Sequence, residues 1–95
     1  MSTSDVVPYD FELKPYSDNR FEFSFRHQCD FEDLVGRVHI SGAFSSIMCV
    51  PHPASTGDQY LWELMSQDPI TIHPSILCRN CGMHGWVRQG LWVPA

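Results

Sequence analysis

The chain has 95 residues, of which 43% are hydrophobic and 13% aromatic, and its formal net charge is −5 at pH 7. This composition predicts one small globular domain over residues 1–95, with a loose terminus only at residues 1–5, and excludes a disordered chain. The negative charge disfavours nucleic acid as a partner, because an acidic surface repels phosphates. No apolar run reaches membrane-spanning length and no signal peptide is recognisable, so we expect a cytoplasmic protein without membrane contact.

The first half of the chain carries alternating patterns that are typical of short strands. Apolar and polar side chains alternate at residues 21–26, which predicts a half-buried strand. The alternation at residues 38–41 and the run at residues 45–50 predict two more, with Gly42 as a break or bulge between them. Residues 30–34 fit either one helical turn or a tight loop.

The second half predicts further strands and turns. Prolines and small polar residues make 51–58 a loop, and 60–64 fits a short strand or a helical turn. A turn at 67–69 leads to a strand at 70–73 that is stopped by a proline, and residues 86–93 predict a closing β-hairpin. We therefore expect a mainly β, mostly antiparallel single-domain fold with a C-terminal hairpin.

Cysteine and histidine recur at two-residue gaps that are typical of zinc knuckles. Cys78, Cys81 and His84 form one run, and Cys49 and His52 form a second pair. Thiolate and imidazole are the ligands that zinc prefers, and a closed structural site needs four of them. Without a secretion signal, metal ligation is favoured over two disulfides. Five candidates thus compete for four places on a zinc ion, and spacing alone ranks Cys78 equal to Cys81.

Other sites are weaker on this evidence. His27 and Cys29 are separated by a single residue, and we interpret Cys29 as a packing residue and His27 as an edge residue. The spacings required for a zinc deaminase, a c-type haem, a thioredoxin-like dithiol and a metalloprotease helix are absent. A thiol nucleophile, Cys49 or Cys78 beside a histidine, stays open as an alternative to a closed zinc site.

Several short motifs resemble a known family. These are the glycine-containing strand at 34–41, the tryptophan strand at 62–64, the apolar strand at 70–76 that ends in proline-serine-isoleucine, and the segment at 81–87. Together they resemble domain-of-unknown-function family 6527, which groups small bacterial and phage proteins. The resemblance covers about two-thirds of the chain, and the chain departs from it by having fewer cysteines near residue 49.

The resemblance implies which residues bind the metal. It makes Cys81 and His84 the C-terminal metal pair, so the expected zinc ligands are Cys49, His52, Cys81 and His84, with Cys78 as the alternative ligand. We assign no catalytic residue.

The resemblance also implies a setting. Some members of family 6527 occur beside genes for bacterial ubiquitin-like conjugation and others are carried by phages, which implies a small accessory protein. We place first a non-enzymatic, zinc-stabilised interaction module with a protein partner, for which Trp62, Trp86 and Trp92 are candidate anchors. The alternatives are a phage-encoded inhibitor of a host defence complex, and a cysteine- or zinc-dependent hydrolase that acts on protein conjugates.

Overall fold

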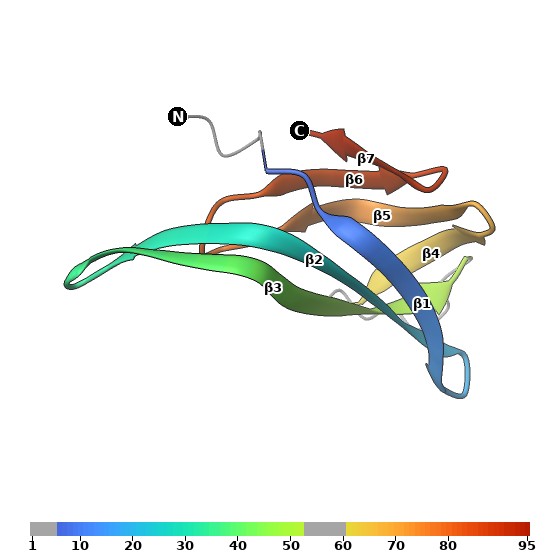
Figure 1. The fold of residues 1–95 in the computed structure, drawn as a ribbon. Helices are drawn as coiled ribbons and strands as arrows, with labels where there is room; N and C mark the ends of the chain where they lie inside the picture. Colours follow the sequence, from blue (N-terminus) through green and yellow to red (C-terminus); the bar gives the residue numbers. More distant parts are fainter. Residues whose placement is uncertain (1–5, 53–60) are drawn as a thin grey trace.

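A computed structural model describes residues 6–52 and 61–95. These residues form one seven-stranded sheet that curls into a half-barrel, with the strands in chain order from β1 to β7 (Figure 1). The strands are β1 (Tyr9–Ser17), β2 (Arg20–Asp33), β3 (Gly36–Pro51), β4 (Trp62–Gln67), β5 (Ile70–Leu77), β6 (His84–Arg88) and β7 (Leu91–Pro94). No helix that is long and apolar enough to cross a membrane occurs in the described part of the chain.

The mainly β, mostly antiparallel fold is confirmed, with one exception to the antiparallel pairing. Neighbouring strands pair antiparallel except β3 and β4, which run parallel over three residue pairs, from Cys49 with Trp62 to Pro51 with Leu64. This short pairing is where β1–β3 joins β4–β7 within the sheet. The long hairpin of β2 and β3 extends beyond the other strands (Figure 1).

The core is built by residues that alternate along the strands. In β2, Phe23, Phe25, His27 and Cys29 are all buried, because every second side chain of a strand points to the same face. Buried apolar residues of β3–β6 and of the β5–β6 loop pack against them in a single cluster. The inner face of the half-barrel is therefore filled from both parts of the sheet.

Several local predictions need correction. Residues 30–33 continue β2 instead of forming a helical turn, and the chain reverses at Leu34 and Val35, where the Val35 N–H donates to the Asp33 carboxylate at 2.9 Å. Gly42 bulges one continuous β3, and its φ of 68° is a conformation that glycine adopts without strain. Pro74 does not end its strand, since β5 runs on to Leu77.

Other expectations have simpler outcomes. The strand alternative for residues 60–64 is confirmed in part, because β4 begins at Trp62, and the closing hairpin of β6 and β7 is confirmed. The predicted loose terminus and most of the predicted loop at 51–58 lie outside the described residues. Strand β1 was not predicted.

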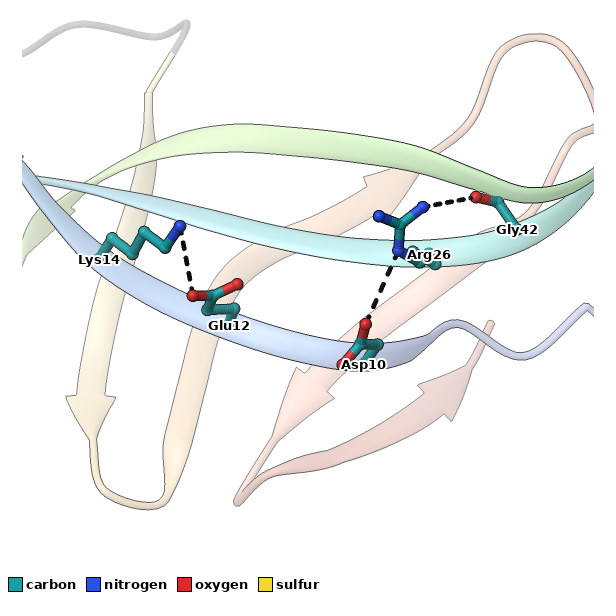
Figure 2. A network of polar contacts seen from close by, with 5 residues as sticks. All are labelled: Asp10, Glu12, Lys14, Arg26 and Gly42. Atoms are coloured by element: carbon teal, nitrogen blue, oxygen red, sulfur yellow. Dashed lines mark hydrogen bonds and ion pairs between the residues drawn. The ribbon is translucent and has the colours of Figure 1, made fainter.

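Polar contacts on the sheet surface join the first three strands. Arg26 of β2 lies 3.7 Å from the Asp10 carboxylate of β1 and donates to the Gly42 carbonyl of β3 at 3.0 Å (Figure 2). Lys14 pairs with Glu12 on β1 at 3.3 Å in the same view. These groups are exposed, so each ion pair adds at most about 1 kcal/mol of stability.

Gly85 tests the packing of the C-terminal hairpin. A Cβ atom there would collide with the Val93 carbonyl oxygen and would lie 2.6 Å from the Trp92 ring. We expect Gly85→Ala to lower the free energy of unfolding by about 3 kcal/mol, as overpacking does in other cores. Urea unfolding measures this, with Ser41→Ala on the exposed surface of β3 as the control. Equal stability of the two variants would contradict the described packing.

Candidate metal centre and serine–histidine pair

Four potential metal ligands converge on the inner face of the sheet. His27 and Cys29 come from β2, and Cys78 and Cys81 come from the loop between β5 and β6. One ligand atom from each residue lies within 4.8 Å of the other three, and three of the four residues are buried. Among the described residues this is the one such group of His, Cys, Asp or Glu side chains.

The spacing of the sulfur atoms fits a bound metal ion better than a disulfide. All four cysteines are free thiols, and the Sγ atoms of Cys29 and Cys78 are 3.7 Å apart. Two sulfurs that bind one tetrahedral zinc ion at about 2.3 Å lie about 3.8 Å from each other. A disulfide would instead bring them to about 2.05 Å. The pair thus already has the separation of one edge of a zinc-centred tetrahedron.

His27 supplies an independent sign that a ligand belongs at this place. Its side chain is 1% exposed, and neither ring nitrogen has a hydrogen-bond partner. A buried polar atom without a partner is rare because it loses its hydration without compensation. Burial also lowers the pKa of His27, so the ring is held in the neutral form that binds metals. The residues present therefore fit a metal ion.

The β5–β6 loop turns backbone N–H groups toward sulfur. Burial alone would raise the pKa of Cys78, but N–H groups of Asn80 and Cys81 donate to its sulfur and bring the pKa below the usual value. The Met83 N–H donates to the sulfur of Cys81 in the same way, although burial keeps the pKa of that thiol raised. Such donors stabilise metal-bound thiolates.

The thiol of Cys29 on β2 is harder to ionise than the thiol of Cys78 in the loop. Burial, together with the smaller effect of the contact with Cys78, raises the pKa of Cys29 to about 12. A buried thiol of this kind stays protonated unless a cation compensates its charge. A divalent metal ion supplies that compensation.

The residues expected from the sequence are distributed over several places. Cys81 and its alternative Cys78 lie in the cluster, but Cys49, His52 and His84 do not. Cys49 is fully buried in the core, where burial raises the pKa of its thiol to about 12. His52 follows the end of β3 and its Nδ1 contacts the carboxylate of Glu63. Among the residues expected from the sequence, the cluster thus contains only Cys81 and the alternative Cys78, both in the β5–β6 loop.

Sequence reasoning missed two of the clustered residues. The pattern indicates an edge residue at His27, which is wrong because His27 is buried, and a packing residue at Cys29, which is buried as expected; both face Cys78 and Cys81. The signal was their single-residue gap in a strand, which places both on one face. The local pattern carries no information on the curl of the sheet, which brings β2 close to the β5–β6 loop.

His84 instead pairs with a serine. Its Nε2 lies 2.9 Å from the Oγ of Ser75, and the contact is partly buried. Ser75 lies on β5 where the ladder to β6 is irregular between Ile72 and Ile76, as expected beside Pro74, which has no N–H to donate. In the tautomer with its proton on Nδ1, the Ser75 hydroxyl donates a hydrogen bond to Nε2 of His84. The motif at 70–76 contains this serine, but the spacing of His84 indicates a zinc ligand and not a partner of Ser75.

Neighbouring side chains hold this pair in place. The indole N–H of Trp62 on β4 donates to the Ser75 carbonyl at 3.2 Å. The ring of Trp86 lies 6.1 Å from that of His84, and the Arg88 guanidinium lies 4.9 Å from the centre of a Trp86 ring. Three strands thus contribute to the position of the serine and the histidine.

The cluster and the serine–histidine pair lie on opposite faces of the sheet. Ile76 pairs with Gly85, and both are buried. Since successive side chains of a strand point to opposite faces, the preceding residues in each strand, Ser75 and His84, point away from the core. The four clustered residues lie on the core side, where Cys29 and Cys81 belong to the buried cluster.

The comparisons give the family. Residues 42–95, more than half of the chain, match the family described as bacterial ubiquitination-like system serine protease (BubE). The chain belongs to the BubE family. The match includes Ser75, His84, Cys78 and Cys81, and it begins after His27 and Cys29.

Membership in the BubE family confirms the expected link to bacterial ubiquitination-like systems. The narrower resemblance to family 6527 stays a prediction. No curated protein and no solved structure matches the chain.

His27 can be tested in the metal-free protein. We expect His27→Leu to raise the free energy of unfolding by about 1–3 kcal/mol without metal, because it removes two buried unpaired nitrogens. Urea unfolding in the presence of a chelator and a thiol reductant measures this. His73→Leu, on the exposed side of β5, is the matched control. A loss of metal-free stability in His27→Leu would mean that the ring nitrogens have partners.

Proposed function

We propose that this protein is a serine hydrolase of a bacterial ubiquitination-like system, with Ser75 as the nucleophile and His84 as the general base. The observation that carries the proposal is the 2.9 Å contact between Ser75 Oγ and His84 Nε2. A serine hydroxyl is a weak nucleophile until an adjacent base takes its proton, and this distance is within hydrogen-bond reach. The description of the family as a serine protease supports the same choice of residues.

The reaction follows from the two side chains. Ser75 Oγ attacks the carbonyl carbon of the scissile acyl bond as its proton passes to His84 Nε2. The bond to the leaving group then breaks, and His84 returns the proton to that group. His84 next deprotonates a water molecule, which attacks the acyl-serine ester. The ester bond then breaks, the acid product leaves, and His84 returns the proton to the Ser75 oxygen. The Trp62 contact to the Ser75 carbonyl and the Trp86 ring beside His84 keep both partners oriented.

The substrate class follows from the family and from the exposure of the pair. We propose that the scissile bond is a peptide or isopeptide bond of a ubiquitin-like protein, so the partner is another protein of the system. The pair lies at the surface of a sheet, partly buried, where an extended segment of a partner can reach it. This hydrolase takes the place of the non-enzymatic module that the sequence alone placed first.

We further propose that the cluster binds zinc as a structural ion. Three cysteines and one histidine are a common closed ligand set for structural zinc, and such a set leaves no position for a reacting water. The orphaned His27 ring and the 3.7 Å sulfur separation support this ligand set over Cys49, His52, Cys81 and His84. Zinc bound there would stabilise the fold and would not contact the substrate.

The hydrolase proposal predicts the effect of two substitutions. Ser75→Ala and His84→Ala should each lower the rate of conjugate cleavage at least about 1,000-fold, because nucleophile and base act as a unit. Labelling of Ser75 by a fluorophosphonate probe should disappear in Ser75→Ala. Ser66→Ala and His39→Ala are the matched controls and should retain the rate. Unchanged cleavage in Ser75→Ala would exclude this serine as the nucleophile.

The zinc proposal predicts different outcomes for two buried cysteines. We expect one zinc ion per chain in the wild-type protein and in Cys49→Ala, and none in Cys29→Ala, because both thiols are buried but only Cys29 belongs to the cluster. Chelation with thiols reduced should lower the wild-type midpoint by at least about 10 °C. Elemental analysis and thermal unfolding measure both. Zinc lost from Cys49→Ala and kept by Cys29→Ala would refute the ligand set.

A further inference from the structure

The β5–β6 loop connects the proposed nucleophile to the proposed base. Ser75, Cys78, Cys81 and His84 follow one another at every third residue, so the two cysteines stand between the reacting residues. The Cys78 N–H donates to the Met83 carbonyl at 2.8 Å, and the Gly82 N–H donates to the Cys78 carbonyl at 2.7 Å. One tight turn thus presents sulfur to the inner face of the sheet, and its two ends carry the hydroxyl and the imidazole on the other face.

Few backbone residue pairs between β5 and β6 fix the position of this turn. Beyond the pairs Leu77 with His84 and Ile76 with Gly85, the register between β5 and β6 is irregular until Ile72 with Val87. Ser75 lies inside the irregular stretch. The separation of Ser75 from His84 is therefore set by two residue pairs, by the Trp62 contact and by the shape of the turn.

The cluster adds a connection that the sheet does not provide. Among residues 6–52 and 61–95, the strands β1–β3 pair with β4–β7 only through the three-residue parallel pairing of β3 with β4. His27 and Cys29 belong to β2, in the first part, while Cys78 and Cys81 belong to the second. Figure 1 shows the β5–β6 connection beside β2, as the ligand distances require. An ion bound by these four residues would link the β5–β6 turn to β2.

We propose that the ion bound by His27, Cys29, Cys78 and Cys81 positions the serine–histidine pair, so that hydrolysis requires zinc although zinc never touches the substrate. This inference rests on the proposed function. His27 and Cys29 precede the segment that matches the family, and they act as positioning residues for a pair that lies within it. A misplacement of about 1 Å between reacting groups lowers a rate about 100-fold. Loss of the ion should therefore slow the chemical step and leave binding of the probe unchanged.

The first experiment uses the 95-residue chain with and without zinc, under thiol-reducing conditions. Hydrogen exchange should speed up on chelation much more in residues 75–86 than in residues 9–17 of β1, which contain no member of the cluster and serve as the internal reference. Readdition of zinc should restore the protection. Equal acceleration in both regions would overturn the proposal, because the ion would then be a general folding staple. No change in either region would also overturn it.

The second experiment measures labelling of Ser75 by a fluorophosphonate probe. The maximal labelling rate should fall about 100-fold in the zinc-free protein, while the probe concentration for half-maximal rate changes by less than about twofold. Cys29→Ala should behave like the zinc-free protein, and Cys29→His, which restores a zinc ligand from β2, should recover the rate. Full labelling without zinc would overturn this inference and leave the hydrolase intact. No labelling of the zinc-loaded wild type would overturn the hydrolase, while hydrogen exchange would still test the ion's effect on the hairpin.

Discussion

The meeting of β2 with the β5–β6 loop is the constraint on which the rest of this structure depends. It places a buried imidazole without hydrogen-bond partners beside three thiols, two of which are 3.7 Å apart. Burial makes this arrangement costly unless a cation compensates it. The two strands that the same loop connects carry Ser75 before its first cysteine and His84 after its last. The cluster on one face of the sheet and the proposed catalytic pair on the other face are thus both positioned by the β5–β6 turn.

Much of the fold could be predicted from local patterns. The alternation at residues 21–26 gave the buried face of β2, and the glycine-containing turn near residue 90 gave the closing hairpin. The lengths and the continuity of the strands were harder to predict. A bulge at Gly42 in β3 and an irregular ladder at Pro74 in β5 interrupt the pairing without ending either strand. The parallel pairing of β3 with β4 depends on contacts far apart in the sequence, which no local pattern encodes.

The site could be predicted only in part, for the same reason. Spacing drew attention to the Cys78–Cys81 loop, because these two members of the cluster come from one turn. The other two come from a strand about fifty residues earlier in the chain, and only the curl of the sheet brings them there. His84 has ligand spacing, yet it follows the turn on a strand and points to the opposite face, toward Ser75. The face of the sheet on which a histidine lies, more than its spacing, decides which histidine belongs to the cluster.

X-ray absorption at the zinc edge of the purified, reduced protein tests the central claim most directly. The ligand set His27, Cys29, Cys78 and Cys81 predicts three sulfur neighbours at about 2.3 Å and one nitrogen neighbour at about 2.0 Å. The set expected from spacing and family resemblance, which includes Cys49, His52 and His84, predicts two sulfurs and two nitrogens instead. Two nitrogens, or a protein that binds no zinc, would contradict the account.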